Sequence, residues 1–394
     1  MQNLISITPA AAHPQRAFDF DDVPFDYEVS LTPEVESLLQ HNCVVAIGVS
    51  GGKDSVACAL AVDCHLKSIG HSGPRLLIHA DLGRVEWTYS LPSCQRLAAH
   101  IGWELVVVRR KAGDMLARWQ GRWENNLARY RQLSCVKIIL PWSTPALRFC
   151  TSELKVAVIT SALRKRFPKS DIVNVAGIRR QESTSRSRMP VSAPMAKLER
   201  KGAAGVTWNA IIDWSLDQVL HAISESGLAL HEAYTKYGSS RVSCAFCIMG
   251  SESDLLASSG CADNQDVYRQ MVELEADSTF AFQGNRWLAD VAPVLLSTDL
   301  RERIQEAKRK AVLRQSIEAE LPAHLLFTEG WPTAMPTDGE ADLIASVRLR
   351  ISELLGIAAK HLDGDSVRDR YAELMAAHEV NKSLKTKRIS LRSA

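Results

Sequence analysis

The chain contains 394 residues, of which 46% are hydrophobic and 23% charged, and its formal net charge is only +2. These proportions are typical of a soluble globular protein, and no apolar run approaches the roughly 20 residues that a membrane-spanning helix requires. The odd number of cysteines, nine, argues against a disulfide framework. The first thirty residues lack the basic and apolar regions of a signal peptide, so we expect a cytoplasmic protein without a membrane partner.

Strand-like and helix-like segments alternate after residues 1–28, which we expect to form a loosely held arm. Buried strands are expected at residues 43–49, 75–81, 104–110 and 171–178. Helices are expected at 55–67, 89–101 and 213–226, the last with Asp213 as a cap. This alternation predicts an α/β fold, an open and mostly parallel sheet with helices on both faces.

The last third of the chain lacks strand patterns. Segments 297–321, 340–358 and 365–382 have helical periodicity, and residues 327–340 read as a loop. We therefore expect an α/β domain at 29–250 and a helical region at 251–394, whose final fourteen residues carry five basic side chains and no acid. Further basic clusters, at 164–169 and 179–188, leave room for a phosphate-rich partner, although any one of them also fits a solvated surface.

A glycine hinge separates the first expected strand from its helix. Glycines allow positive φ and a close ligand approach, and the N–H groups at a helix start attract anions. Lys53 adds a cation to this arrangement. The hinge is not a Walker A loop, because Ile47 stands where that loop needs its first glycine and Asp54 follows the lysine. The pattern predicts a phosphate cradle, with an unliganded turn as the alternative, formed by Ser50, Gly51, Gly52, Lys53, Asp54 and Ser55.

Polar residues recur where later strands end and helices begin. Asp81 ends a strand, where ligands bind in open α/β sheets, so it could face a ribose or a metal or simply cap a turn. The segment "LRFCTSELK" places Arg148, Cys150, Thr151 and Lys155 at a helix start. Arginine forks bind phosphate oxygens in a bidentate manner, although a solvated basic loop remains the alternative. The residues of "GIRRQESTSRSR" that we single out are Gly177, Arg179, Arg180, Glu182, Arg186 and Arg188.

A C-x-x-C pair, Cys244 and Cys247, suits two ligands of one metal or cluster. With Cys150 and Cys261 it could complete a four-thiolate set for a [4Fe–4S] cluster or a structural zinc, and Cys135 is a spare candidate. Two alternatives stay open: thiols without metal, and Cys150 as a catalytic thiol. The histidines show no metal spacing, and three further cysteines in apolar surroundings are expected in the core: Cys43, Cys58 and Cys64.

The hinge string resembles the pyrophosphate loop (PP-loop) of the ATP pyrophosphatase superfamily. The order of the four segments, over residues 40–250, resembles the phosphoadenosine phosphosulfate (PAPS) reductase family, which includes sulfate adenylyltransferase subunits and the sulfur-transfer components of DNA phosphorothioation systems. The resemblance implies an adenine nucleotide alpha hydrolase-like fold and cleavage of ATP, with Mg²⁺, between the α and β phosphates. It implies catalytic roles for Lys53, Asp54, Cys150 and Arg179. It implies nucleotide contacts for the cradle, Asp81 and Gly177, and phosphate contacts for Arg148, Lys155, Arg180, Glu182, Arg186 and Arg188.

Departures from the family pattern narrow the expectation. PAPS reductases carry a degenerate loop and a C-terminal nucleophilic cysteine, whereas this chain keeps the full loop and its last cysteine is Cys261. Phosphorothioation components combine the loop with a cysteine cluster. The resemblance therefore implies adenylylation for sulfur transfer, with DNA as the acceptor, iron–sulfur favoured over zinc, and a cysteine desulfurase or other sulfur donor protein as partner. Sulfate or tRNA as acceptor remains an alternative, as does an ATP-binding sensor or assembly subunit.

Overall fold

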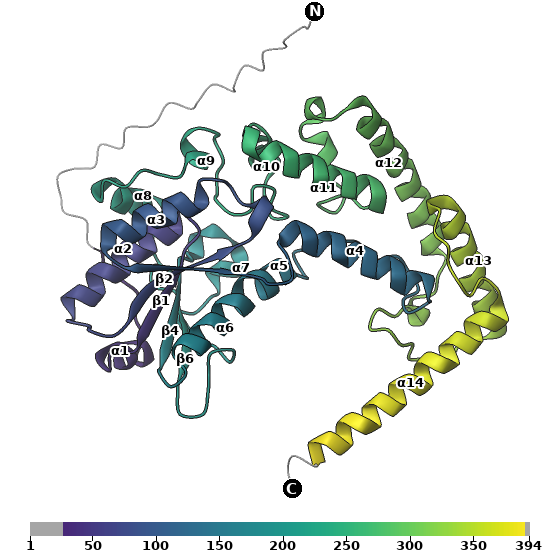
Figure 1. The fold of residues 1–394 in the computed structure, drawn as a ribbon, viewed down its shortest axis with the longest axis horizontal. Coiled ribbons are helices and arrows are strands. Elements are labelled where there is room, and N and C mark those ends of the chain that lie inside the picture. The colour runs from purple at the N-terminus through teal and green to yellow at the C-terminus, as the bar shows by residue number, and fades with distance from the viewer. Residues whose placement is uncertain (1–26, 391–394) are drawn as a thin grey trace, which may run out of the picture. The chain divides into compact units, whose positions relative to one another are not determined.

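The computed structural model describes residues 27–390, with side chains up to residue 384 (Figure 1). All but two residues of the expected N-terminal arm therefore lie outside the described residues, as do residues 391–394 of the tail. The chain divides into two compact units, Met1–Leu116 with Ser143–Tyr268, and Ala117–Trp142 with Arg269–Ala394. Residues 117–142 thus group with the C-terminal helices, so the units interleave along the sequence. The domain bounds at residues 250 and 251 stay a prediction.

The first unit is built on a six-stranded sheet with the strand order β3-β2-β1-β4-β6-β5 (Figure 1). Neighbouring strands are parallel, except that β5 runs antiparallel to β6 at one edge. The predicted α/β fold with a mostly parallel sheet is confirmed, but the sequence patterns did not indicate the last two strands. The strands are β1 (Val44–Gly48), β2 (Arg75–Asp81), β3 (Glu104–Arg109), β4 (Ile172–Ala176), β5 (Ser192–Pro194) and β6 (Gly205–Trp208).

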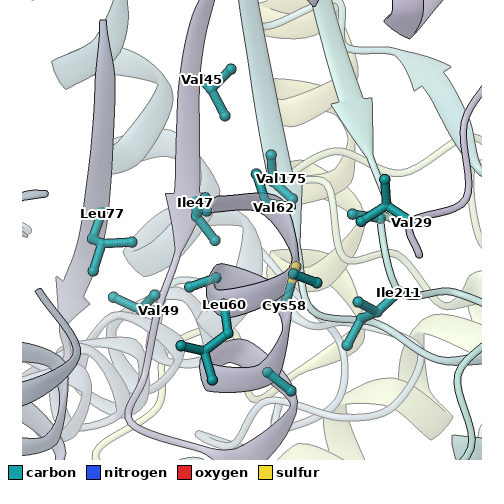
Figure 2. Close-up of a cluster of buried hydrophobic side chains, with 14 of the residues drawn as sticks. Val29, Val45, Ile47, Val49, Cys58, Leu60, Val62, Leu77, Val175 and Ile211 are labelled. Atoms are coloured by element: carbon teal, nitrogen blue, oxygen red, sulfur yellow. The ribbon is translucent and has the colours of Figure 1, made fainter. Parts of the chain in front are cut away.

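Helices cover both faces of this sheet, which explains the continuous apolar run of β1. Val45 and Ile47 pack into a cluster with α2 residues such as Cys58 and with Val175 of β4 (Figure 2). Their neighbours in β1, Val44 and Ala46, join the opposite cluster, which contains Leu163 of α6. Successive side chains of a strand point to opposite faces, so a strand buried on both faces reads as uniformly apolar.

The helices of the first unit follow the strands in alternation. The N-cap of α8 is Ser215, whose hydroxyl accepts a hydrogen bond from the N–H of Gln218. The expected cap Asp213 is wrong, because its carboxylate pairs with Arg180 and accepts from Ser30 instead.

The longer helices are α1 (Pro33–Gln40), α2 (Lys53–Ser68), α3 (Ser90–Ile101), α6 (Ala157–Arg166), α8 (Leu216–Glu225) and α10 (Glu252–Ser259); the short ones are α5 (Phe149–Thr151), α7 (Thr184–Ser187) and α9 (Glu232–Thr235).

The second unit is helical, as the C-terminal periodicity predicts. It contains most of α4 (Met115–Arg131) and of α11 (Gln265–Ser278), followed by α12 (Thr298–Ala319), α13 (Asp338–Leu355) and α14 (Gly364–Ser390). Its core includes an aromatic cluster in which the rings of Trp119 and Trp142 lie 5.4 Å apart and those of Trp142 and Phe282 lie 5.1 Å apart. None of the described helices is long and apolar enough to cross a membrane.

Candidate active site

The glycine hinge lies at the carboxyl end of β1 and opens α2, as the sequence predicts. Gly51 has a φ of 75°, and a Cβ atom there would lie 2.9 Å from the backbone oxygen of Ser90. A Cβ on Gly177 would lie 2.5 Å from the backbone oxygen of Asp54. Neither position has room for a side chain, so both glycines are required for the loop to pack against α3 and the end of β4.

Free N–H groups mark the start of α2. Its N-cap is Gly52, which provides no side-chain cap. The backbone N–H groups of Gly51, Gly52 and Asp54 have no hydrogen-bond partner within residues 27–390. The Ser55 hydroxyl donates to the Gly52 carbonyl at 2.8 Å and so braces the turn. Unpartnered N–H groups at the positive end of a helix dipole form a binding site for an anion.

Lys53, Asp54 and Arg179, three predicted catalytic residues, are brought together beside these N–H groups. Arg179 is 4% exposed, and its Nε atom lies 2.6 Å from a carboxylate oxygen of Asp54. The other oxygen of Asp54 lies 3.6 Å from the Lys53 ammonium. One carboxylate therefore holds two cations beside the free N–H groups of the loop.

A second chain segment, residues 231–243, closes over the same loop, which the sequence did not indicate. The hydroxyl of Tyr234 accepts hydrogen bonds from the backbone N–H groups of Lys53 and Val242, both at 3.2 Å. The Lys53 ammonium lies 4.9 Å from the centre of the Tyr234 ring and donates to the carbonyl of Ser240 at 3.1 Å. Tyr234 thus links the cradle directly to the loop that carries the C-x-x-C pair.

The carboxylate of Asp254 holds that cysteine-bearing loop in place through hydrogen bonds. Its carboxylate accepts from the N–H and hydroxyl groups of Ser240, at 2.8 and 2.9 Å, and from those of Ser251. These bonds outweigh burial and lower the pKa of Asp254, so the group is ionised near neutral pH. The carbonyl that receives Lys53 is therefore held in place by a charged clamp.

His231 borders the cradle from the same segment. It lines a small cavity with Gly51, Ser93 and Arg96, and its Nδ1 atom accepts from the N–H of Ala233 at 3.0 Å. Burial, with the nearby charge of Arg96, lowers the pKa of His231 to about 4. The imidazole is therefore neutral at physiological pH and adds shape, rather than charge, to the wall of the loop. A second described histidine, His79, also approaches the cradle, because its Nδ1 atom lies 3.0 Å from the carbonyl oxygen of Val49.

The remaining predicted phosphate contacts divide into paired and free side chains. Asp81 ends β2 as expected, but its carboxylate binds Arg109 and accepts from the N–H of Gly83 at 2.7 Å. Arg180 pairs with Asp213, and Arg186 pairs with Glu182. Glu182 also accepts from the Arg179 N–H at 2.8 Å, which confines the loop after β4. The exposed side chains without a partner in the described structure are Arg148 and Arg188.

A π-helical turn, Ser152–Val156, carries the next group of predicted residues. Arg148 caps the preceding α5, which contains Cys150 and Thr151, and Lys155 lies within the π turn. Single π turns within helices are frequent at functional sites. The charge of Lys155 acts on the Cys244 thiol, so the two predicted segments face each other within the first unit.

The four cysteines do not form the predicted ligand set in this structure. Burial raises the pKa of Cys244 to about 12, and its electrostatic neighbours include Cys247 and Cys150. Cys261 is buried, and its thiol is the main cause that raises the pKa of the Tyr237 hydroxyl. Across residues 27–390, no three His, Cys, Asp or Glu side chains converge closely enough to hold a metal ion. These side-chain positions do not fit a [4Fe–4S] or zinc site.

The other cysteines separate into core and surface residues. Burial is the main cause that raises the pKa values of Cys43 and Cys58 to about 12, as expected for core thiols. Cys64 is exposed, so its predicted core position is wrong. It follows Cys58 by six residues, about one and two-thirds helical turns, and therefore lies on a different face of α2. The spare candidate Cys135 is buried in the second unit.

Comparison with protein-family models identifies the first unit. The phosphoadenosine phosphosulfate reductase domain matches residues 44–250, more than half of the chain. The chain belongs to this family. The matched range of the PAPS reductase domain begins with β1 and ends just after the C-x-x-C pair, so it includes the cradle, Arg179 and Tyr234. A comparison with curated proteins gave no match.

Solved structures resemble the PAPS reductase domain at low sequence identity. A PAPS reductase from Candida auris, crystallised with phosphate, is 14% identical, with 55% of this chain and 97% of that chain covered and a TM-score of 0.34. The U34-tRNA thiolase NcsA from Methanococcus maripaludis, which contains a [4Fe–4S] cluster, is 15% identical, with 71% and 77% covered and a TM-score of 0.32. These values are too low for either neighbour to indicate a substrate.

Proposed function

We propose that this chain is a PP-loop ATP pyrophosphatase that adenylylates an acceptor for sulfur transfer, with the backbone of DNA as the acceptor. The observation that carries the proposal is the cradle itself. Three unpartnered N–H groups, a positive-φ glycine without room for a side chain, and two cations on one carboxylate meet at a helix start. Family membership is consistent with sulfur metabolism, and the complete loop favours ATP use over PAPS reduction.

In the proposed first step, the free N–H groups of the cradle bind the β and γ phosphates of ATP. An acceptor oxygen attacks the α phosphorus, an acceptor–AMP bond forms, and the bond to pyrophosphate breaks. Lys53 and Arg179 offset the charge that develops on the leaving pyrophosphate. Asp54 keeps both cations in position before ATP arrives, and Tyr234 fixes the backbone of Lys53 through its hydroxyl.

In the proposed second step, a sulfur nucleophile displaces AMP from the activated acceptor. With DNA, a non-bridging phosphate oxygen would carry the AMP, and the attack of sulfur at that phosphorus would leave a P–S bond and release AMP. A sulfur donor protein, such as a cysteine desulfurase, would supply the sulfur as a persulfide. After the terminal sulfur attacks, a second thiol would cleave the S–S bond, which leaves the phosphorothioate and a disulfide. Mg²⁺ would enter with the triphosphate of ATP, since Mg²⁺ is commonly held by substrate phosphates and one or two carboxylates. No step is assigned to a metal cluster, because the described thiols do not converge.

The test is the identity of the nucleotide products from ATP and Mg²⁺, using anaerobically purified protein. Duplex DNA, tRNA and sulfate are added in separate reactions, and an Asp217→Asn variant serves as a control for surface charge. We expect AMP and pyrophosphate, with stimulation by DNA. Stimulation by tRNA or sulfate instead would keep the loop chemistry but replace the acceptor. ADP and phosphate, or no turnover with any acceptor, would overturn the proposal and favour an ATP-binding sensor or assembly subunit.

A further inference from the structure

A basic groove lies at the end of the sheet where the parallel strands begin, opposite the cradle, which lies where they end. We call these two ends the amino edge and the carboxyl edge. The groove has a volume of about 500 Å³. One wall is α6 with the segment that leads from it into β4, and the other is the hairpin loop between β5 and β6. The strands between the two edges are about five residues long, so the groove and the cradle are separated by roughly 15 Å of sheet. Its lining residues are Ala157, Thr160, Ser161, Arg164, Lys165, Pro168, Lys197 and Arg200.

Four cations line this groove and no acid does. Arg164, Lys165 and Lys197 are exposed, and their side chains make no ion pair or hydrogen bond with any residue that the structure describes. Basic residues in the last turn of a helix are expected on electrostatic grounds alone, because they complement the helix dipole. That explanation covers the two residues of α6. It does not cover the cations that the hairpin contributes, which lie outside any helix.

Arg200 provides an independent sign that the groove binds an anion. It is half-buried, and its Nη2 atom donates to the carbonyl of Ser170 at 2.6 Å. Its Nε and Nη1 atoms are buried without any hydrogen-bond partner in the described chain. Leaving a buried charged donor unsatisfied is costly, so such groups usually have a partner that the structure lacks. The unpaired guanidinium therefore adds an uncompensated positive charge to the wall of the groove.

The two walls of the groove are held together by a shared core. Leu198 of the hairpin and Leu163 of α6 are both fully buried in one cluster with Ile172 of β4. A Cβ atom on Gly205 would lie 2.4 Å from the Cβ of Leu198, so only glycine allows the hairpin to fold back this closely. The cations are therefore presented from a fixed frame and not from a loose loop.

We infer that this groove binds the phosphodiester backbone of a nucleic acid. The choice of nucleic acid among polyanions rests on the proposed function, whereas the anion preference rests on the groove alone. An open groove with four separated cations suits an extended polyanion better than a single small anion. Contacts of this kind are independent of sequence, and each one increases the magnitude of the salt slope, the steepness with which log K falls with log[salt], by about one unit. The groove would anchor DNA away from the cradle while another stretch is modified.

The test compares an Arg164→Ala/Lys197→Ala double variant with an Arg166→Ala variant. Arg166 lies on the same helix but outside the groove lining, and it pairs with Glu104. Fluorescence anisotropy measures binding of a 20-base-pair DNA duplex and of single-stranded RNA between 50 and 300 mM salt. In the double variant we expect binding to weaken by more than tenfold near 0.1 M salt and the salt slope to fall by about two units. The Arg166 variant should change the slope by less than half a unit.

Other outcomes decide against the inference. Equal binding by wild-type and double-variant proteins would show that the groove is not the docking site. Equal affinity of the wild-type groove for polyglutamate would show a general acidic partner, and loss of DNA binding on adding 1 mM phosphate would show a small-anion site. At a duplex DNA concentration that saturates each protein, AMP and pyrophosphate formation should be the same in the double variant as in the wild type. A failure of the proposed function would appear there, as absent AMP in every protein, and would leave the binding result interpretable.

Discussion

The two edges of the same sheet hold their cations in opposite ways. At the carboxyl edge, Lys53 and Arg179 share Asp54, and the flanking Arg180 and Arg186 each have a carboxylate partner. At the amino edge, the groove cations have no acidic partner in the described structure. At the carboxyl edge, ion pairs hold each cation in a defined position. At the amino edge, the unpaired cations create a positive potential that attracts any polyanion.

The two arrangements suit different tasks: paired cations are positioned for a ligand in advance, whereas unpaired cations attract a ligand from solution. A cation that already has a carboxylate partner gains little free energy when a phosphate replaces that partner, but its geometry is set before the ligand arrives. A free surface cation releases counterions on binding and therefore contributes to affinity and to the rate of encounter, without geometric precision. Catalysis fits the carboxyl edge and docking fits the amino edge.

The largest expected effect is on turnover, when one lysine at each edge is replaced by alanine. Lys53→Ala should reduce AMP and pyrophosphate formation by a factor of about 100 to 1,000, because it removes a charge beside the leaving group. Lys197→Ala removes the same charge at the amino edge and should leave turnover at saturating DNA within twofold. Quantified AMP release measures both. Equal losses in the two variants would erase the distinction between the edges.

Asp54→Asn should have the next largest effect, on stability in the absence of nucleotide. The change keeps the shape of the side chain but removes the charge that Arg179 contacts at 2.6 Å in a buried setting. We expect the free energy of unfolding in urea to fall by about 2 kcal/mol, the range of hydrogen bonds to charged groups. Lys165→Ala, at the amino edge, should change it by less than about 0.5 kcal/mol. A stable Asp54→Asn protein would show that Arg179 is held by other contacts.

The sequence predicts the carboxyl edge well because its signals are local. A run buried on both faces, a glycine pair and a helix start are contiguous in residues 44–68, and the structure places them as expected. The short strands β5 and β6 were missed because three or four residues give too little periodicity. Sequence also cannot show which arginines are paired, since Arg180 finds Asp213 through the fold, 33 residues away.

The four cysteines also show that sequence spacing cannot place residues from distant elements relative to one another. The C-x-x-C spacing fixes two thiols as neighbours in the chain, but the positions of Cys150 and Cys261 depend on elements far apart in sequence. Among the residues that the structure describes, the buried Cys261 does not join the pair in a metal-binding group. Tyr234, which links cradle and cysteine loop, carries no sequence signal either. It reads as an ordinary aromatic residue in a short helix.

The smallest expected effect is that of Tyr234→Phe. This variant tests whether hydrogen bonds, besides the ion pairs, hold the cradle residues in position. The phenyl ring would keep the contact with the Lys53 ammonium, but the N–H groups of Lys53 and Val242 would lose their shared acceptor. We expect KM for ATP to rise about fivefold, equivalent to about 1 kcal/mol, with kcat within twofold. Tyr27→Phe removes a hydroxyl that donates to the Ala222 carbonyl of α8, and KM should stay unchanged.

The same variant distinguishes a positioning role from a purely structural one. If Tyr234 transmits the state of the cradle to the cysteine loop, saturating ATP should slow alkylation of Cys247 in the wild type and lose that effect in Tyr234→Phe. Coupling of this kind is reciprocal, so modification of the thiol should weaken ATP binding by the same factor. Unchanged protection in the variant would mean that the two loops respond to ATP independently, and the carboxyl edge would then be ordered by its ion pairs alone.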